Sequence, residues 1–342
     1  MSLVLKVREI DQPQIWNQLV EDLPIQSVLQ SWGWGEVKRA AGWQPLRLVL
    51  ERGSEPVAAV QLLFRSFLGP LAMAYAPRGP ALTDINDFPD VASTLASYVK
   101  RGIYLKFEPE VGFPLPGEPP AFNGLNLEAP IQPGYSIWVD LSGGEEAVLA
   151  AMKSKTRYNT RLSQRKGVVA GLEESFSEFY ALFEETNQRA KLNQHPRRYY
   201  QTVLEKMNQP GGQAFISLAR LEGLPLAAGM FVTFGGKLVY LYGGSTRDHK
   251  EVMAPYAMHW AAIQHGIDLG LETYDLWGVP KDPEGSLAAG IDRFKEGYGG
   301  VRLAFPAYDF PLSPVYQPLK RALRVRKDLV NLRKRGAVQD AV

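Results

Sequence analysis

A strand–turn–strand pattern occurs twice in this chain, and the second copy keeps the order and spacing of the first. In each copy an antiparallel hairpin is followed by a further strand, a helix and a last strand. Three pairs of matching positions lie 169, 167 and 170 residues apart, and they are Pro56 and Pro225, Leu71 and Leu238, and Tyr104 and Tyr274. Because chance alternation of strands would not keep such a register, the repeat predicts a duplicated α/β domain.

The order of elements within each copy narrows the fold class. A hairpin and a third strand, followed by a helix and a closing strand, is the order of an acyltransferase domain of the N-acetyltransferase type. Such a domain contains a mixed sheet flanked by helices. We therefore expect an α/β fold (α+β mixed sheets) of two tandem acetyltransferase-like (GNAT) domains. The boundary is expected within residues 109–134, where Pro and Gly are dense.

The composition excludes several kinds of site. The 342 residues include no cysteine, which rules out disulfides, thiolate metal sites and a cysteine nucleophile, and fits a reducing compartment. The first residues become charged too early for a signal peptide, and no apolar run approaches the roughly 20 residues of a membrane-spanning helix. The formal net charge of +2 requires no particular partner. We expect a cytoplasmic protein.

The familiar nucleophile and metal motifs do not occur. The chain has no Gly-x-Ser-x-Gly elbow, and its four histidines form neither an i, i+4 pair nor a His-Glu-x-x-His motif. His259 and His265 share one predicted helix, where we expect satisfied or exposed side chains and no metal. Asp275 ends a predicted strand and suits either a carboxylate base or a structural role.

Acetyl-CoA enzymes of this fold class hold phosphates on a glycine-rich loop at the start of a helix. The corresponding turns here are residues 76–80, which contain prolines, and residues 245–255, which are charged and bulky. Neither turn offers a run of free amides. The sequence therefore disfavours acetyl-CoA as a donor, and we expect no cofactor.

An aromatic–lysine pair precedes a glycine-rich segment near the end of the second copy. Phe294 and Lys295 are followed by Gly297, Gly299 and Gly300. A ring beside an ammonium, with glycines that let backbone come close, suits a site for an anionic or polarised group. The alternative is a strand end and a turn with a surface lysine.

Basic residues gather in two stretches. The first recurs every four residues, which sets its members along one side of a predicted helix that also carries Lys155 and Lys166, and it comprises Lys153, Arg157, Arg161 and Arg165. The second is C-terminal and comprises Lys320, Arg321, Arg324, Arg326, Lys327, Arg333, Lys334 and Arg335. Such surfaces attract phosphate backbones without reading sequence. A solvated helix face is the alternative for the first stretch, and contact with anionic lipid for the second.

Four segments, taken together and in order, resemble the Fem family of peptidoglycan interpeptide-bridge aminoacyltransferases. They are residues 30–38, residues 155–168, residues 240–245 and the Phe-Lys-Glu-Gly-Tyr-Gly segment 294–299. No heptads are present, so the chain resembles the compact type without a coiled-coil arm. The resemblance implies two tandem acetyltransferase-like domains with the C-terminal segment returning to the first. Domain 1 would then be residues 1–133 plus 306–342, and domain 2 residues 134–305.

The resemblance also implies a reaction. An amino acid (Gly, Ala or Ser) would pass from its tRNA to the side-chain amine of the third residue of a precursor's stem peptide. The precursor would be nucleotide-linked (UDP) or lipid-linked, and domain 1 would bind it. The enzyme would be a monomer, with possible peripheral contact at the inner face of the membrane through the basic C-terminus.

Site residues follow from the same resemblance. Lys38 and Arg197, with Arg198 as the alternative to Arg197, would hold precursor phosphates. The same precursor site would include Tyr242, Tyr75 and Glu108, the last of which stands where relatives often carry aspartate. Phe294 and Lys295 would lie at the aminoacyl end of the tRNA, and the basic stretch Lys153, Arg157, Arg161 and Arg165 would bind the tRNA itself.

The expected mechanism is aminolysis of an activated ester, with Lys295 stabilising the negative charge of the tetrahedral intermediate. Phe294 would pack against the ribose or the terminal base. No residue presents itself as a general base. Two alternatives remain open at this point: an acyltransferase of polysaccharide or lipid assembly that uses a thioester, and a non-catalytic scaffold that binds RNA.

Overall fold

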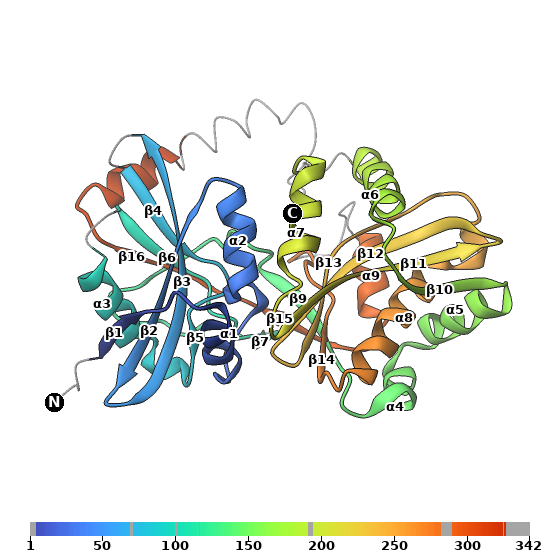
Figure 1. Ribbon diagram of the computed structural model, residues 1–342, viewed down its shortest axis with the longest axis horizontal. Coiled ribbons are helices and arrows are strands. Elements are labelled where there is room, and N and C mark those ends of the chain that lie inside the picture. Colours follow the sequence, from blue (N-terminus) through green and yellow to red (C-terminus); the bar gives the residue numbers. More distant parts are fainter. Residues whose placement is uncertain are drawn as a thin grey trace. The chain divides into compact units, whose positions relative to one another are not determined.

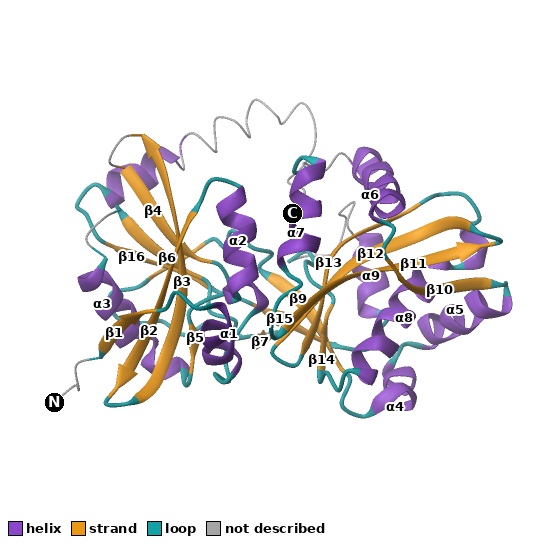
Figure 2. Ribbon diagram, in the orientation of Figure 1, coloured by secondary structure: helices purple, strands orange, loops and turns teal. Residues whose placement is uncertain are grey.

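The chain folds into two compact units, each built on a mixed sheet of eight strands (Figures 1 and 2). The computed structural model describes residues 5–68, 71–99, 102–115, 117–190, 194–281, 289–323 and 325. Unit 1 comprises Met1–Val111, Glu118–Gln132 and Phe305–Val342, and unit 2 comprises Gly112–Gly117 and Pro133–Ala304. Among the described residues, no helix has the length and apolar character needed to span a membrane.

In the sequence of unit 1, the third helix lies between two strands, β4 and β6, that pair in parallel. Its sheet has the order β1-β2-β3-β4-β6-β16-β8, with β5 paired to β3. The helices are α1 (Pro13–Glu21), α2 (Trp32–Ala40) and α3 (Phe88–Tyr98), with 3₁₀ turns η1 (Val28–Gln30) and η2 (Ile85–Asp87). The strands are β1 (Lys6–Glu9), β2 (Gln44–Arg52), β3 (Glu55–Leu68), β4 (Leu71–Ala76), β5 (Ala81–Leu82), β6 (Tyr104–Phe107), β8 (Asn126–Glu128) and β16 (Ala307–Pro311).

Unit 2 repeats this plan with more helices. Its sheet has the order β10-β11-β12-β13-β14-β9-β15-β7. The helices are α4 (Gly144–Ala151), α5 (Ser154–Arg165), α6 (Phe176–Ala190), α7 (Arg197–Lys206), α8 (Ala254–Asp268) and α9 (Ala289–Glu296), with η3 (Lys250–Val252). The strands are β7 (Phe113–Pro114), β9 (Tyr135–Asp140), β10 (Val168–Glu173), β11 (Gly212–Leu221), β12 (Leu224–Phe234), β13 (Lys237–Ser245), β14 (Thr273–Asp275) and β15 (Val301–Ala304).

The predicted duplication is confirmed by the strand pairing. The order β1-β2-β3-β4-β6 in unit 1 matches β10-β11-β12-β13-β14 in unit 2, and the parallel pairs β4–β6 and β13–β14 occupy equivalent places. Even the irregularities repeat: the first hairpin changes register between Leu50 and Glu51, and the second between Ala219 and Arg220. The predicted order of hairpin, third strand, helix and last strand is confirmed in both units.

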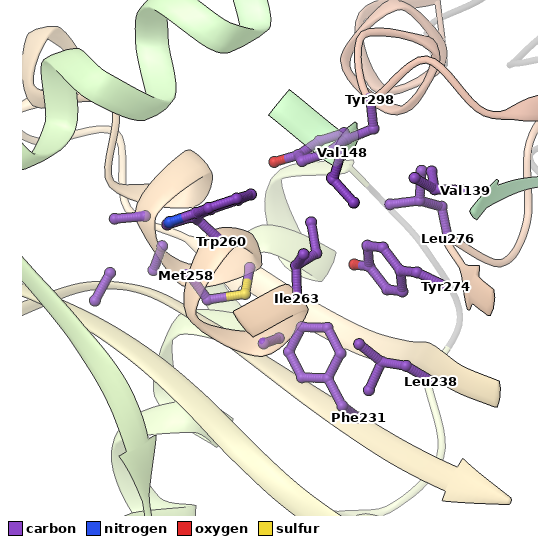
Figure 3. Close-up of a cluster of buried hydrophobic side chains, with 14 of the residues drawn as sticks. Val139, Val148, Phe231, Leu238, Met258, Trp260, Ile263, Tyr274, Leu276 and Tyr298 are labelled. Carbon is purple, nitrogen blue, oxygen red and sulfur yellow. The ribbon is translucent and has the colours of Figure 1, made fainter. Parts of the chain in front are cut away.

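Helix α8 covers one face of the second sheet and supplies much of that unit's core. Figure 3 shows Met258 and Ile263 of α8 directed toward Phe231, Leu238 and Tyr274 on the strands. All five side chains are at most 2% exposed. Full burial of each such side chain contributes about 1.5–3 kcal/mol of hydrophobic stabilisation. This rigid layer supports the residues described next.

Candidate active site

Phe294 and Lys295 lie on helix α9, so the interpretation of this pair as a strand end is wrong. The helix ends at Glu296, and the N–H of Gly297 bonds back to the carbonyl of Phe294 at 3.2 Å. Phe294 is half-buried, whereas Lys295 is only 8% exposed. A buried lysine is uncommon and requires partners. The plain alternative of a surface lysine is therefore also wrong.

The glycines after α9 serve packing within the protein. A β-carbon at Gly297 would collide with the hydroxyl of Thr156 on α5. A β-carbon at Gly299 would collide with the carbonyl of Ala151, and one at Gly300 with the carbonyl of Trp138. The expectation that these glycines open the backbone to a ligand is thus corrected: they let the end of α9 press against α4, α5 and β9.

The ammonium of Lys295 is held by two backbone carbonyls. Its Nζ donates hydrogen bonds to the carbonyl oxygens of Trp277 and Gly278, the latter at 2.7 Å. Both residues form a left-handed turn after β14, with φ of 52° and 36°. For Trp277 this conformation costs about 1–3 kcal/mol and persists only where neighbours fix it. Asp275 supplies that support, because its carboxylate accepts the Trp277 N–H at 2.7 Å and the hydroxyl of Ser136.

Burial shifts the acid–base behaviour of Lys295. Desolvation lowers its pKa to about 8, and the carboxylates of Asp275 and Asp292 oppose this shift. The group is therefore mostly an ammonium at neutral pH and loses its proton within a slightly alkaline range. Such a tuned cation, in a site shielded from water, can stabilise charge that develops on a reacting oxygen.

An aromatic layer lies beside the ammonium. The Phe294 ring is 4.9 Å from that of Tyr256, 5.2 Å from that of His259 and 5.5 Å from that of Tyr298. His259 shares a short hydrogen bond with the hydroxyl of Tyr274. Burial, together with the charge of Lys295, lowers the pKa of His259 to about 3, so this imidazole is neutral at physiological pH. His259 is thus a satisfied helix histidine, as the sequence predicted.

Strands β13 and β14 separate at this site. Their parallel pairing ends at Val239 and Asp275, but β13 continues to Ser245. No described strand pairs with this continuation on that side, and residues 240–245 are all partly exposed. The backbone of Ser245 is hydrogen-bonded to Thr186 and Arg189 of α6, so the edge without a described partner is confined to residues 240–244. Lys295 Nζ lies 5.7 Å from the centre of the Tyr240 ring, at the point of separation. The site therefore combines a fixed cation with an open strand edge, which can bind an extended ligand.

A β-bulge directs two tyrosines to opposite faces of the sheet. In β12, Met230 and Phe231 are adjacent and point to opposite faces, yet their partners on β13 are Tyr242 and Tyr240. Tyr240 therefore faces α8, where its ring lies 4.6 Å from that of His259. Tyr242 faces α6 and α7, and Figure 1 shows these helices away from α8. Without the extra residue, both tyrosines would lie on one face.

On the α6–α7 side, Tyr242 and Arg197 belong to one aromatic cluster. The Tyr242 ring lies 4.9 Å from that of Tyr200, which in turn lies 6.0 Å from that of Tyr180. The guanidinium of Arg197 lies 4.8 Å from the centre of the Tyr180 ring. Arg198 is exposed on the same helix. The structure thus links Tyr242 to Arg197 through Tyr200 and Tyr180, and it places Lys295 on the other side of the sheet.

In unit 1, Tyr75 and Glu108 form a buried clamp. Glu108 is 1% exposed and accepts the Tyr75 hydroxyl at 2.6 Å. It also accepts the N–H groups of Ile131 and Gln132, the latter at 3.3 Å. Desolvation raises the pKa of Glu108, although these hydrogen bonds oppose the rise. The carboxylate therefore fastens residues 131–132 to the sheet, and its predicted role in precursor binding stays a prediction.

Lys38 is the predicted phosphate ligand of unit 1. It lies in the last turn of α2, with Nζ 4.5 Å from the centre of the Trp34 ring. Its side chain is partly exposed, and crowding by protein lowers its pKa to about 8. A partly desolvated ammonium can bind an anion at a lower desolvation cost than a fully hydrated one, because part of its hydration shell is already lost.

The structure describes the first basic stretch in full and the second only in part. The first forms α5 with its N-cap residue Lys153, as predicted. Lys153 binds Glu296 at 3.1 Å, and Arg157 donates to the carbonyls of Leu149 and Ala150 at the end of α4. In the second stretch Lys320 is held inside unit 1 by two carboxylates, Asp309 at 2.6 Å and Glu128 at 3.2 Å. The positions Arg324, Arg326, Lys327, Arg333, Lys334 and Arg335 lie outside the described residues.

The sequence pattern missed the residues that fix Lys295. The sequence marks Asp275 only as a strand-end carboxylate, whereas the structure gives it a structural role in holding the Trp277–Gly278 turn. Trp277 and Gly278 act through their carbonyl groups, which no side-chain motif reveals. Tyr240 is one of many strand tyrosines, and only the strand pairing singles it out.

The sequence of this chain is similar to those of a family of known proteins. The model of the FemAB family matches residues 14–115, 120–223 and 212–322. A UDP-N-acetylmuramoylpentapeptide-lysine N(6)-alanyltransferase from Weissella viridescens is 26% identical over 305 residues, which is 82% of this chain and 88% of the relative. A lipid II:glycine glycyltransferase from Staphylococcus haemolyticus is 21% identical, with 89% of this chain and 93% of the relative covered.

A solved structure shares the whole fold. The crystal structure of FemX superposes with a TM-score of 0.79 at 17% sequence identity, and the match covers 91% of this chain and 99% of that one. The predicted arrangement of two acetyltransferase-like domains is therefore found in a protein of known structure.

Proposed function

This chain belongs to the FemAB family and is an aminoacyltransferase, and we propose that it transfers glycine, alanine or serine from tRNA to the stem peptide of a peptidoglycan precursor. The acceptor would be the side-chain amine of the peptide's third residue. The relatives' names support this choice, since one specifies a lysine of UDP-N-acetylmuramoyl pentapeptide and the other specifies lipid II. The reaction uses charged tRNA, so we place the enzyme in the cytoplasm.

The single observation that carries the proposal is the ammonium of Lys295. It is buried, held on two carbonyls, and located where β13 leaves β14. The backbone of β13 offers a donor and acceptor edge for the extended aminoacyl end of the donor. An ester carbonyl bound along this edge would gain negative charge next to the ammonium. One fixed donor of this kind typically contributes about 2.7–4 kcal/mol to transition-state stability.

The reaction balances without a covalent enzyme intermediate. The acceptor nitrogen attacks the ester carbonyl carbon of the aminoacyl-tRNA, and a tetrahedral oxyanion forms. The new C–N bond remains, the C–O bond to the tRNA ribose breaks, and the ribose oxygen takes up the proton that the nitrogen loses. Lys295 stabilises the oxyanion. Phe294, on the same helix, packs against the ribose or the terminal base, which shields the ester from water.

Precursor binding is proposed for two groups of residues, one in each unit. In unit 1 Lys38 supplies a cation for phosphate. Tyr75 and Glu108 are buried, so their proposed part in precursor binding is to hold residues 131–132 in place. In unit 2 the proposed cation is Arg197 or Arg198, of which Arg197 shares an aromatic cluster with Tyr242. Both arginines are exposed, and Arg197 in addition packs on Tyr180.

The test is a transfer assay with a mixed pool of charged tRNAs. Purified enzyme is incubated with UDP-linked or lipid-linked pentapeptide, and the products are measured by mass spectrometry. The proposal predicts a precursor heavier by one amino-acid residue, and ribonuclease treatment of the pool abolishes the product. A product that survives ribonuclease treatment, or RNA binding without any product, would overturn the proposal.

A further inference from the structure

Basic residues are concentrated on the exposed face of α5. The helix and its two flanking residues contain six Lys and Arg residues and no carboxylate. Its buried face is made of four small polar side chains, Thr156, Asn159, Thr160 and Ser163, all at most 4% exposed. Figure 1 shows α5 beside α8 and β10, against which this face packs. The cations must therefore point elsewhere.

The helical geometry sorts the basic residues into two groups. Successive residues of an α-helix rotate by about 100°, so a spacing of four advances by about 40° around the axis. The basic series thus begins at the edge of the buried face, at Lys153, and reaches the centre of the exposed face at Arg165. Lys153 pairs with Glu296, and Arg157 binds α4 carbonyls, as described above.

Arg161 and Arg165 remain exposed, and Tyr158 joins them at the centre of the outer face. Tyr158 is 56% exposed, which is unusual for a large aromatic side chain in the middle of a helix. The guanidinium of Arg165 lies 5.5 Å from the centre of the Tyr158 ring. An arginine stacked near an exposed tyrosine, with a second arginine one turn away, offers both charge and a flat apolar surface.

The N-terminal end of α5 contacts the C-terminal end of α9, which carries Lys295. The backbone N–H of Lys153 bonds to the carbonyl of Gly297 at 2.9 Å, directly after α9. Lys153 also binds Glu296, the residue after Lys295. The helix then runs about 18 Å away from that point, which spans several phosphates of one nucleic-acid strand. A polyanion bound along α5 would therefore have one end near Lys295.

We propose that Tyr158, Arg161 and Arg165 form the docking surface for the acceptor arm of the donor tRNA, with the arginines on backbone phosphates and the tyrosine ring on a base or ribose. The inference rests on the proposed function and names the surface that its donor uses. Of the predicted set, Lys153 and Arg157 also make internal contacts, and their part in tRNA binding stays a prediction. Phosphate contacts of this type supply affinity without sequence reading, and aromatic stacking adds to it.

The test compares tRNA binding by matched variants. We expect Arg161→Glu/Arg165→Glu to weaken the Kd for charged or uncharged tRNA by about tenfold or more at 0.1 M salt, and to reduce the slope of log Kd against log salt by about 2. Tyr158→Ala should weaken binding less, and Tyr158→Phe should bind as wild type. The control Lys206→Glu/Lys250→Glu makes the same charge change at exposed positions off α5 and should bind as wild type.

The outcomes separate this inference from the proposed function. Circular dichroism and thermal melting confirm folding, and the milder Arg161→Gln/Arg165→Gln variant replaces the first one if it fails to fold. Equal tRNA affinity in the α5 variants and wild type, while wild type still transfers amino acids, overturns the surface alone. The same holds if the α5 variants lose binding only to anionic phospholipid vesicles. Absence of transfer by wild type overturns the proposed function instead.

Discussion

The ammonium of Lys295 lies 2.7 Å from the carbonyl oxygen of Gly278, a residue that is seventeen positions earlier and held in a left-handed turn. This contact joins α9 to the end of β14 and fixes a cation where two strands separate. The turn depends on Asp275, whose carboxylate accepts the N–H of Trp277. The position of the cation is therefore set by backbone geometry and one buried carboxylate.

Asp275→Asn tests the support of this turn. The change removes a carboxylate that raises the pKa of Lys295, so that pKa should fall below about 8 and less ammonium should be present at pH 7.5. We expect single-turnover transfer to fall on the order of 10- to 100-fold, because small displacements of a catalytic group are costly. The rate relative to wild type should recover as the pH decreases. Asp140→Asn, at an exposed strand end, serves as the control and should transfer as wild type.

The pH dependence of Lys295 itself can be isolated with arginine. Burial lowers the lysine pKa to about 8, so the stabilising charge is present below that pH and lost above it. In Lys295→Arg the guanidinium stays charged throughout, although it fits less well. The ratio of wild-type to Lys295→Arg single-turnover rates should fall about tenfold between pH 7 and pH 9. A ratio that is constant over this range would show that the ammonium charge does not contribute.

Gly297→Ala tests the packing of α9 against α5. The new β-carbon would meet the Thr156 hydroxyl, and overpacking of this kind costs about 1–3 kcal/mol. Thermal melting should show a loss of several degrees. Thr156→Ala removes the colliding oxygen, so the double variant should regain part of the loss, with Thr156→Ala alone as the reference. Additive losses in the double variant would refute the contact.

The clamp in unit 1 can be tested by unfolding in urea. Tyr75→Phe removes one hydrogen bond to Glu108 and should cost about 1–2 kcal/mol of unfolding free energy. Glu108→Ala also leaves two N–H groups of residues 131–132 without their acceptor, so it should cost more, about 3 kcal/mol. An unchanged stability in Glu108→Ala, together with a higher KM for the precursor, would show that Glu108 serves substrate binding instead.

Much of the fold could be predicted because the duplicated strands show local alternation of apolar and polar residues, and turn residues mark their ends. The strands around Pro56 and Pro225 are recognisable from short apolar runs, and their common offset specifies a repeat. Helix α9 is harder to predict, because the eight residues Ala289–Glu296 are too few to show a clear helical periodicity of apolar residues. The glycines that follow it also suit a turn. Here tertiary contacts with α4, α5 and β9 decide the structure.

The site was only partly predictable for a different reason. Motif resemblance identified Phe294 and Lys295 by their side chains, but the partners of Lys295 are carbonyl groups. Likewise Tyr240 and Tyr242 are two positions apart, and simple alternation would place both on one face. The bulge opposite Met230 and Phe231 separates them, and it arises from strand pairing that the sequence does not display.

The central claim is that the Lys295 ammonium stabilises the oxyanion of aminoacyl transfer. Lys295→Met keeps a side chain of similar length without charge and removes the cost of burying an ammonium, so the variant should fold. With saturating aminoacyl-tRNA and precursor, the account predicts that its single-turnover rate falls about 100- to 1000-fold while tRNA affinity is retained. The melting temperature should fall by only a few degrees, because the carbonyls of Trp277 and Gly278 lose their donor but the buried charge is also removed. Lys206→Met should transfer as wild type. A wild-type rate in Lys295→Met would contradict the account.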